Sequence, residues 1–152
     1  MRKKIILVGT NHGVQGQDFN GTNQFQKIII ALMVKHDIQL IFEEWDWLET
    51  SWITVGHKIA IDRSLPWKNV GTPNEPEYET CSDFLTSGGA VTVYTPTTQS
   101  TREICMLGNI RQTMKDYNAG MFILGLAHMQ SMSEKLILLG FEIEAYEWQK
   151  PK

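Results

Sequence analysis

The stretch KIILVGTNH, Lys4–His12, decides the fold. It opens with a continuous apolar run, Ile5–Val8, which is typical of a strand buried on both faces of a parallel sheet. Gly9 ends the run, and His12 follows three residues later. Glycine and asparagine are common in turns because both tolerate positive φ. A histidine directly after such a strand has no such backbone reason, and it marks a candidate site.

Two more apolar runs of strand length follow, at Ile38–Phe42 and Met121–Leu124. Between the first two runs, Gln24–His36 repeats apolar residues at helical spacing, which indicates an amphipathic helix. The chain closes with an alternating strand, Phe141–Tyr146. This order of strands and helices predicts an α/β fold with a mixed, mainly parallel central sheet flanked by helices.

Two capping boxes predict the later helices. Ser100 and Glu103 indicate a helix from about Ser100 to Tyr117, and Ser131 with Glu134 indicates another that stops at Gly140. Glu103 therefore has two interpretations, a helix cap or a site residue, and the sequence leaves both open.

The stretch 45–99 differs in character from the rest of the chain. It holds four of the five Trp and four of the five Pro, with weak periodicity. We expect a loop-rich insertion in a single α/β domain, 1–152. Within it we expect a short helix at Trp47–His57 and a strand at Ala90–Tyr94, with the tryptophans packing the insertion against the core.

Composition excludes several classes of protein. The chain is 42% hydrophobic and 20% charged, with a formal net charge of −3, so nucleic acid is not an expected partner. One local cluster of cations, Arg2–Lys4, precedes an apolar run too short for a signal sequence or a membrane span. We therefore expect a cytoplasmic protein without a membrane partner. Cys81 and Cys105 could form a disulfide, but free thiols are favoured there.

Polar residues follow all three buried strands. His12 follows the first, Glu43 and Glu44 the second, and His128 the third. Because the carboxyl ends of parallel strands meet at one edge, these side chains are expected at one site.

The two loops that carry the histidines share the sequence motif G-x-x-H, at Gly9–His12 and at Gly125–His128. Adjacent glutamates diverge, and of the two we favour Glu43 as the one that enters the site. Turn histidines bonded to backbone and solvated strand-end glutamates are the structural alternatives.

The helix that begins near Ser100 carries further candidates. Arg102, Met106 and Asn109 share one helical face. A cation in the first turn opposes the helix dipole, so Arg102 is expected to meet an anion or a carboxylate of the site.

At these residues the sequence resembles a diffuse superfamily that includes erythromycin esterases, ChaN-like haem-binding lipoproteins, TraB/PrgY pheromone-shutdown proteins and the Tiki Wnt-inactivating proteases. The matching segments are GTNH at 9–12, FEE at 42–44, REICMLGN at 102–109 and GLAH at 125–128. The chain is shorter than most members, and it has Thr10 where the esterase branch often has an acid.

The resemblance implies a mixed α/β fold with a site at the strand ends, and hydrolysis of an ester or peptide bond. It also implies a role for each matching residue. His12 and His128 would be catalytic or metal-binding, Glu43 or Glu44 an acidic partner, and Arg102 with Glu103 the first-turn pair of the site helix.

The leading hypothesis is a small hydrolase in which a histidine–glutamate pair activates water, with Arg102 or the second histidine holding the oxyanion. Asn11 and Asn109 are expected to bind the small-molecule or peptide substrate. A second version holds a divalent metal on His12, His128 and a glutamate. The competing hypothesis is a non-catalytic binding protein for a small anionic, metal or haem-type ligand at the same site. Oligomeric state and metal identity stay open.

Overall fold

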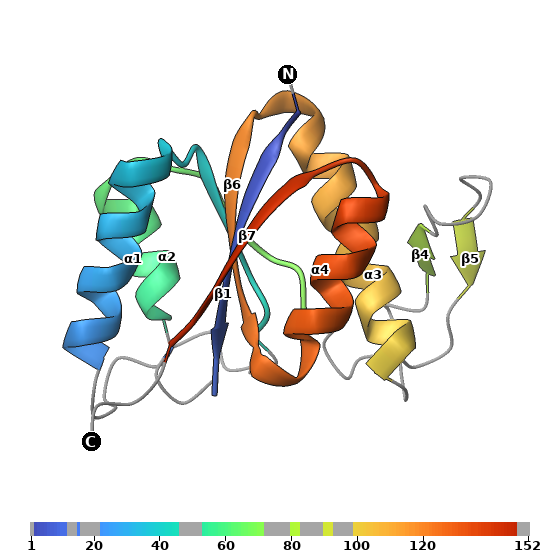
Figure 1. Cartoon of the computed structure of the whole chain (residues 1–152), viewed down its shortest axis with the longest axis horizontal. Coiled ribbons are helices and arrows are strands. Elements are labelled where there is room, and N and C mark those ends of the chain that lie inside the picture. The colour runs from blue at the N-terminus through green and yellow to red at the C-terminus, as the bar shows by residue number, and fades with distance from the viewer. Residues whose placement is uncertain are drawn as a thin grey trace.

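The structure is a computed structural model that describes residues 2–11, 15, 22–45, 53–71, 80–82, 90–92 and 99–148. Of residues 22, 80–82, 90–92 and 99–102 it describes only the backbone. A central sheet lies between two layers of helices, as Figure 1 shows. Its helices are α1 (Thr22–His36) and α2 (Val55–Asp62) on one face, and α3 (Gln99–Thr113) and α4 (Met129–Leu138) on the other.

The central sheet has five strands in the order β3-β2-β6-β1-β7, and all of its neighbouring strands are parallel. Its members are β1 (Lys4–Thr10), β2 (Leu40–Glu43), β3 (Trp67–Asn69), β6 (Ala119–Gly125) and β7 (Glu142–Glu147). The α/β prediction is confirmed, and the sheet is more uniformly parallel than predicted. The separate antiparallel pair β4 (Thr80–Ser82) and β5 (Ala90–Thr92) lies beyond α3 (Figure 1).

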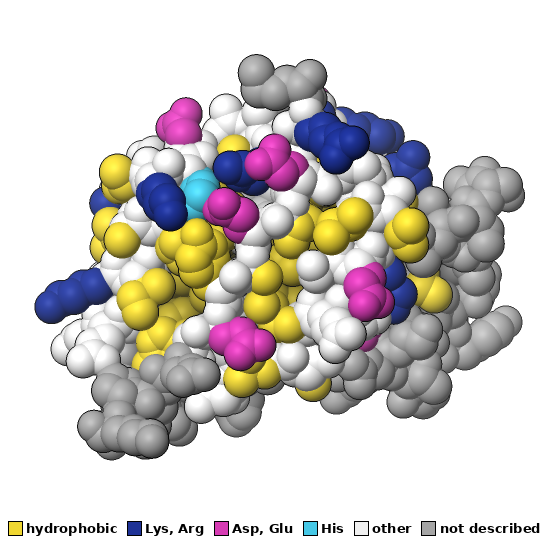
Figure 2. All heavy atoms as spheres, in the orientation of Figure 1, with side chains coloured by type: hydrophobic (Ala, Val, Ile, Leu, Met, Phe, Trp, Pro, Cys, Tyr) yellow, Lys and Arg dark blue, Asp and Glu magenta, His cyan; other side chains and the backbone are white. Residues whose placement is uncertain are grey.

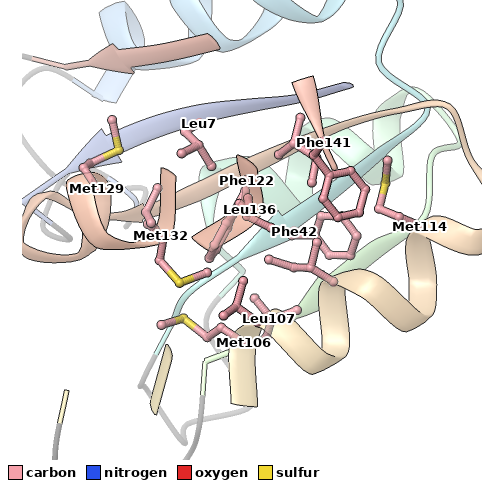
Figure 3. Close-up of a cluster of buried hydrophobic side chains, with 14 of the residues drawn as sticks. Leu7, Phe42, Met106, Leu107, Met114, Phe122, Met129, Met132, Leu136 and Phe141 are labelled. Atoms are coloured by element: carbon pink, nitrogen blue, oxygen red, sulfur yellow. The ribbon is translucent and has the colours of Figure 1, made fainter. Parts of the chain in front are cut away.

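The apolar runs of the sequence are continuous because helices cover both faces of the sheet. Ile5 and Leu7 of β1 join one buried cluster with α3 and α4, whereas Ile6 and Val8 join another with α1 and α2. Figure 3 shows the first cluster, where methionines and leucines of α3 and α4 meet Leu7 and two phenylalanines of the sheet. Each fully buried aliphatic side chain stabilises the fold by about 1.5–3 kcal/mol.

The strand order reverses between β1 and β6. β1 leads through α1 to β2, on one side of this central pair, whereas β6 leads through α4 to β7 on the other side. The helices that follow the two strands therefore lie on opposite faces (Figure 1). The strands end together, with Thr10 paired to Gly125. In open parallel sheets, ligands bind outside the carboxyl ends of strands at such a switch point.

Residues 53–71 supply α2 and β3 to the main fold, although we predicted this stretch to be part of a loop-rich insertion. The predicted helix end at His57 is wrong, because α2 runs from Val55 to Asp62. Thr54 caps it, since its hydroxyl oxygen accepts the N–H of His57 at 3.1 Å. β5 falls within the strand predicted at Ala90–Tyr94.

The predicted helix stop at Gly140 is confirmed, and its geometry explains the glycine. Gly140 has a φ of +95°, which side chains rarely adopt. Its N–H donates to Ile137 and the N–H of Phe141 donates to Leu136, both to backbone oxygens. These two bonds form a Schellman motif, with Phe141 and Leu136 in one buried cluster.

Both predicted capping boxes are wrong. α4 begins at Met129 after a 3₁₀ turn, η4 (Leu126–His128), so Ser131 lies inside the helix. α3 begins at Gln99, and the carboxylate of Glu103 bonds to side chains of η4 and α4 instead of its own helix start. A second 3₁₀ turn, η3 (Met114–Asp116), continues α3 to the predicted end.

The prediction of free thiols is wrong for Cys105, which is disulfide-bonded. α3, which carries Cys105, contacts β4, which carries Cys81. The side chain of Cys81 lies outside the described residues. Within the described part of the chain, no helix is long and apolar enough to cross a bilayer.

Candidate functional site

Glu43 and Glu44 lie at the carboxyl end of β2 and leave the sheet on opposite faces, because successive residues of a strand alternate. Both side chains are completely buried. Glu44 reaches His128 on the side of α3 and α4, and Glu43 reaches Thr54 at the start of α2. The predicted divergence is therefore confirmed. The glutamate that contacts His128 is Glu44, however, whereas we favoured Glu43 as the one that enters the site.

Glu44 bridges the ends of β2 and β6. Its Oε1 accepts the backbone N–H of Gly125 at 2.9 Å, and its Oε2 lies 3.1 Å from Nε2 of His128. Gly125 ends β6, and the turn η4 then carries His128 back over the sheet edge. Gly125 has a φ of −65°, so the turn does not depend on a glycine conformation.

Gly9 is the glycine of the other G-x-x-H motif, and it is required because the structure leaves no room for a side chain there. A Cβ at Gly9 would lie 2.6 Å from Cγ of Met129 and 2.9 Å from a methyl carbon of Leu126. The glycine therefore allows the start of α4 to pack directly on β1, which holds η4 and His128 against the switch point.

His128 is held from its other side by Glu103 of α3. Its Nδ1 lies 2.9 Å from Oε2 of Glu103. The second oxygen of Glu103 accepts Ser131 Oγ at 2.5 Å and Lys135 Nζ at 2.7 Å. Lys135 also donates to Ser131 Oγ at 2.7 Å, so both side chains of α4 fix the carboxylate.

The charges of this network are coupled. The hydrogen bond to Glu44 raises the pKa of His128 most strongly; burial opposes this, and Glu103 raises the pKa further. Burial alone would raise the pKa of Glu103, but hydrogen bonds from Lys135, Ser131 and His128 lower it to about 2. The raised pKa favours the imidazolium form of His128, in which both nitrogens donate to carboxylates.

Glu43 forms a second buried set on the opposite face of the sheet. Its Oε1 accepts Thr54 Oγ1 at 2.5 Å and Trp67 Nε1 at 2.9 Å, and its Oε2 accepts Gln15 Nε2 at 2.7 Å. Thr10, the last residue of β1, donates to Gln15 Oε1 at 2.9 Å. This set links the carboxyl ends of β1 and β2 to Trp67, the first residue of β3, below the surface.

The structure brings together three predicted site residues, Glu44, Glu103 and His128. His12 lies outside the described residues, as does the side chain of Arg102, so their predicted places stay predictions. Asn11 is exposed directly after β1.

Two of the three residues on the predicted face of α3, Met106 and Asn109, have described side chains. Met106 is completely buried in the core, and Asn109 is half-buried beyond it. The face thus runs from the first turn of α3 into the interior of the protein.

A metal does not fit the described donors. A metal ligand needs an imidazole nitrogen with its lone pair directed at the ion, and both nitrogens of His128 face carboxylates. Among the described residues, no three His, Cys, Asp or Glu side chains are arranged to hold an ion. The predicted metal site also depends on His12, which lies outside the described residues, so it stays a prediction.

The sequence reasoning missed Ser131, Lys135, Gln15 and Thr54. One signal existed for the first two, since Ser131 and Lys135 are spaced i, i+4 and so share a helical face. Gln15 precedes α1 and Thr54 precedes α2, and nothing in their local sequence connects them to Glu43.

Comparison of the chain with protein-family models, with curated proteins and with solved structures found no match.

Proposed function

We propose that the chain is a hydrolase of an ester or peptide bond whose proton transfers run between Glu44 and His128. The observation that carries the proposal is this buried pair, with 3.1 Å between Oε2 and Nε2, at the carboxyl edge of β2 and β6. Coupled ionisable groups at such an edge are typical of catalytic sites. The resemblance to a superfamily that includes esterases and proteases supports the same reaction class.

The pair supplies both groups that hydrolysis needs, because Glu44 can accept a proton and the imidazolium of His128 can donate one. The oxygen of a water bonds to the carbonyl carbon of the substrate, and the water proton passes to Glu44. The bond from that carbon to the leaving oxygen or nitrogen breaks, and the leaving atom takes the proton of Nε2. Transfer of the proton from Glu44 to Nε2 restores the starting state.

Glu103 is a positioning residue in this proposal. Its bond to Nδ1 fixes the ring so that Nε2 faces Glu44, and Ser131 and Lys135 fix Glu103 in turn. We retain His12 and Arg102 as candidates for holding the oxyanion, and Asn11 and Asn109 as candidates for binding the substrate.

A binding protein for a small anion is the second candidate. The observation that favours it is that carboxylates contact both nitrogens of His128. Such contacts hold the ring in one charged state, whereas catalysis needs a ring that gains and loses a proton.

The test is turnover of p-nitrophenyl acetate and of a fluorogenic peptide mixture by the purified chain. Glu44→Gln keeps the shape and an acceptor for the N–H of Gly125 but removes the base, so kcat/KM should fall roughly 10²-fold or more. The matched control is His36→Gln. It removes a histidine at the end of α1 that pairs with Glu144 at 3.0 Å and has no contact with Glu44 or His128 among those described. It should leave turnover unchanged.

Turnover that persists in Glu44→Gln contradicts the assigned roles. Folded wild-type protein that hydrolyses neither substrate class, but binds a small anion in a Glu44-dependent way, supports the binding protein instead.

A further inference from the structure

The ends of β1 and β6 meet at the switch point, and the surface residues that follow these two strands are uncharged. Asn11 follows β1, and Leu126 and Ala127 follow β6; all three are exposed. Leu126 and Ala127 share the turn η4 with His128, which is only 6% exposed. A ligand that approaches His128 from this edge therefore meets a neutral surface first.

Leu126 gives this surface an apolar side chain that is 42% exposed. Its Cδ2 carbon would lie 2.9 Å from a Cβ at Gly9, so the side chain lies against the end of β1. Ile53, also 42% exposed, lies at the same edge directly before Thr54, whose hydroxyl donates to Glu43. Single exposed apolar residues are common on protein surfaces, but these two lie where open parallel sheets bind their ligands.

The charges of the buried network beneath this surface cancel one another. Glu44 and Glu103 contact His128, and Glu103 also lies 2.7 Å from Nζ of Lys135. With His128 in its imidazolium form, two negative groups face two positive groups. Glu147, at the end of β7 beside β1, is exposed and adds a negative charge. The described groups thus disfavour an anionic ligand.

The cations of the chain do not follow the strand ends. None of the described residues that directly follow the five strands of the central sheet is Lys or Arg. In Figure 2, Lys and Arg side chains gather along the top of the molecule, where the strands begin, whereas hydrophobic side chains reach the lower edge, where the strands end. An anion that leaves water needs charged or hydrogen-bonding partners in return, so this edge suits an uncharged ligand better.

We propose that the carboxyl edge takes an uncharged ester with an apolar acyl chain, and that this chain lies on Leu126. The inference rests on the proposed function, because it names the substrate class of the same site. An uncharged ester acquires negative charge on its carbonyl oxygen only when water attacks, so the site need not hold an anion beforehand. Leu126 is then a specificity-determining residue that touches the acyl chain.

The first experiment measures binding without turnover, by NMR titration of the full chain. Hexanamide and hexanoate share an apolar chain and differ in charge, and the backbone amide signals of Ala127 and His128 report their binding. Hexanamide should bind saturably, and hexanoate should bind at least roughly tenfold more weakly. This comparison uses the wild-type protein, so it does not depend on the folding of a variant.

Variants at Leu126 then locate the acyl chain. Full burial of a methylene group favours binding roughly fourfold, and contact on one side about twofold, so Leu126→Ser should weaken hexanamide binding roughly tenfold. Leu126→Met keeps an apolar side chain of similar volume and should bind like wild type. The matched control is Ile137→Ser, which removes a 56% exposed apolar side chain near the other end of α4 and should leave binding unchanged.

The second experiment measures kcat/KM for p-nitrophenyl acetate, butyrate and hexanoate after correction for spontaneous hydrolysis. It should rise roughly tenfold from acetate to hexanoate in wild type and stay flat in Leu126→Ser. Hexanamide binding without any ester turnover supports the ligand class and contradicts the proposed function. Turnover that depends on Glu44 but shows no chain-length preference, or hexanoate binding as tight as hexanamide binding, overturns this inference and leaves the proposed function standing. Absence of both binding and turnover overturns both.

Discussion

Replacing Glu103 by Gln removes the negative charge that holds His128 and Lys135 while keeping the shape of the side chain. Folding lowers the pKa of Glu103 from 4.5 to about 2, and the side chain is 1% exposed. At about 1.4 kcal/mol for each unit, this shift stabilises the fold by roughly 3 kcal/mol at pH 7. Glu103→Gln should therefore lower the free energy of unfolding by about that amount.

The sign of the pH dependence follows from the lowered pKa. The contribution of Glu103 is complete above pH 4.5, the unfolded value, and is lost as the pH falls towards 2. About half of it should remain at pH 3. The difference in unfolding free energy between wild type and Glu103→Gln should shrink accordingly.

Urea denaturation at pH 7, 5 and 3 measures this difference. The matched control is Glu134→Gln, an exposed glutamate on the same helix as Lys135, which should change stability by less than about 0.5 kcal/mol. The reasoning is refuted if Glu103→Gln loses no more than this control at pH 7, or if its loss is as large at pH 3.

Three further variants test other parts of the account. Gly9→Ala should cost roughly 1–3 kcal/mol, because its Cβ would overlap Met129, and a thermal melt that matches wild type would contradict the close approach of α4. Thr54→Val loses both the cap of α2 and the hydrogen bond to Glu43, so urea denaturation should show a loss of about 2–4 kcal/mol. His128→Gln removes a group with a raised pKa, whose contribution is complete below pH 6.5 and is lost as the pH rises through the folded value. The stability gap between wild type and His128→Gln should therefore narrow from pH 6 to pH 9, and a gap that widens would contradict the charge assignment.

The main elements could be predicted because their signals are local. The runs at β1, β2 and β6 are apolar on every residue, since helices bury both faces, and α1 shows the apolar spacing of a helix packed on one side. β3 gave no such signal, because its three residues, Trp67–Asn69, are half-buried at the edge of the sheet. Its pairing with β2 is what makes it a strand, and that contact is not encoded locally.

The candidate site was predictable only in part, for a related reason. The strand ends placed Glu44 and His128 at one edge, but which glutamate meets His128 depends on which face α3 and α4 cover. For Glu103, a local capping motif competed with a contact to Lys135, 32 residues further along the chain. Glu103 is buried against His128, Lys135 and Ser131, and these contacts outweigh the local capping motif. A sequence pattern does not show contacts between residues so far apart.

The central claim is that His128 is an imidazolium that donates to Glu44 through Nε2 and to Glu103 through Nδ1. ¹⁵N-detected NMR of the labelled imidazole at pH 7 tests it most directly. Both ring nitrogens of His128 should carry protons in wild type, and Glu44→Gln should lower the pKa of His128 while His36→Gln leaves it unchanged. A neutral ring at pH 7, with one nitrogen unprotonated in the wild-type protein, would contradict the account.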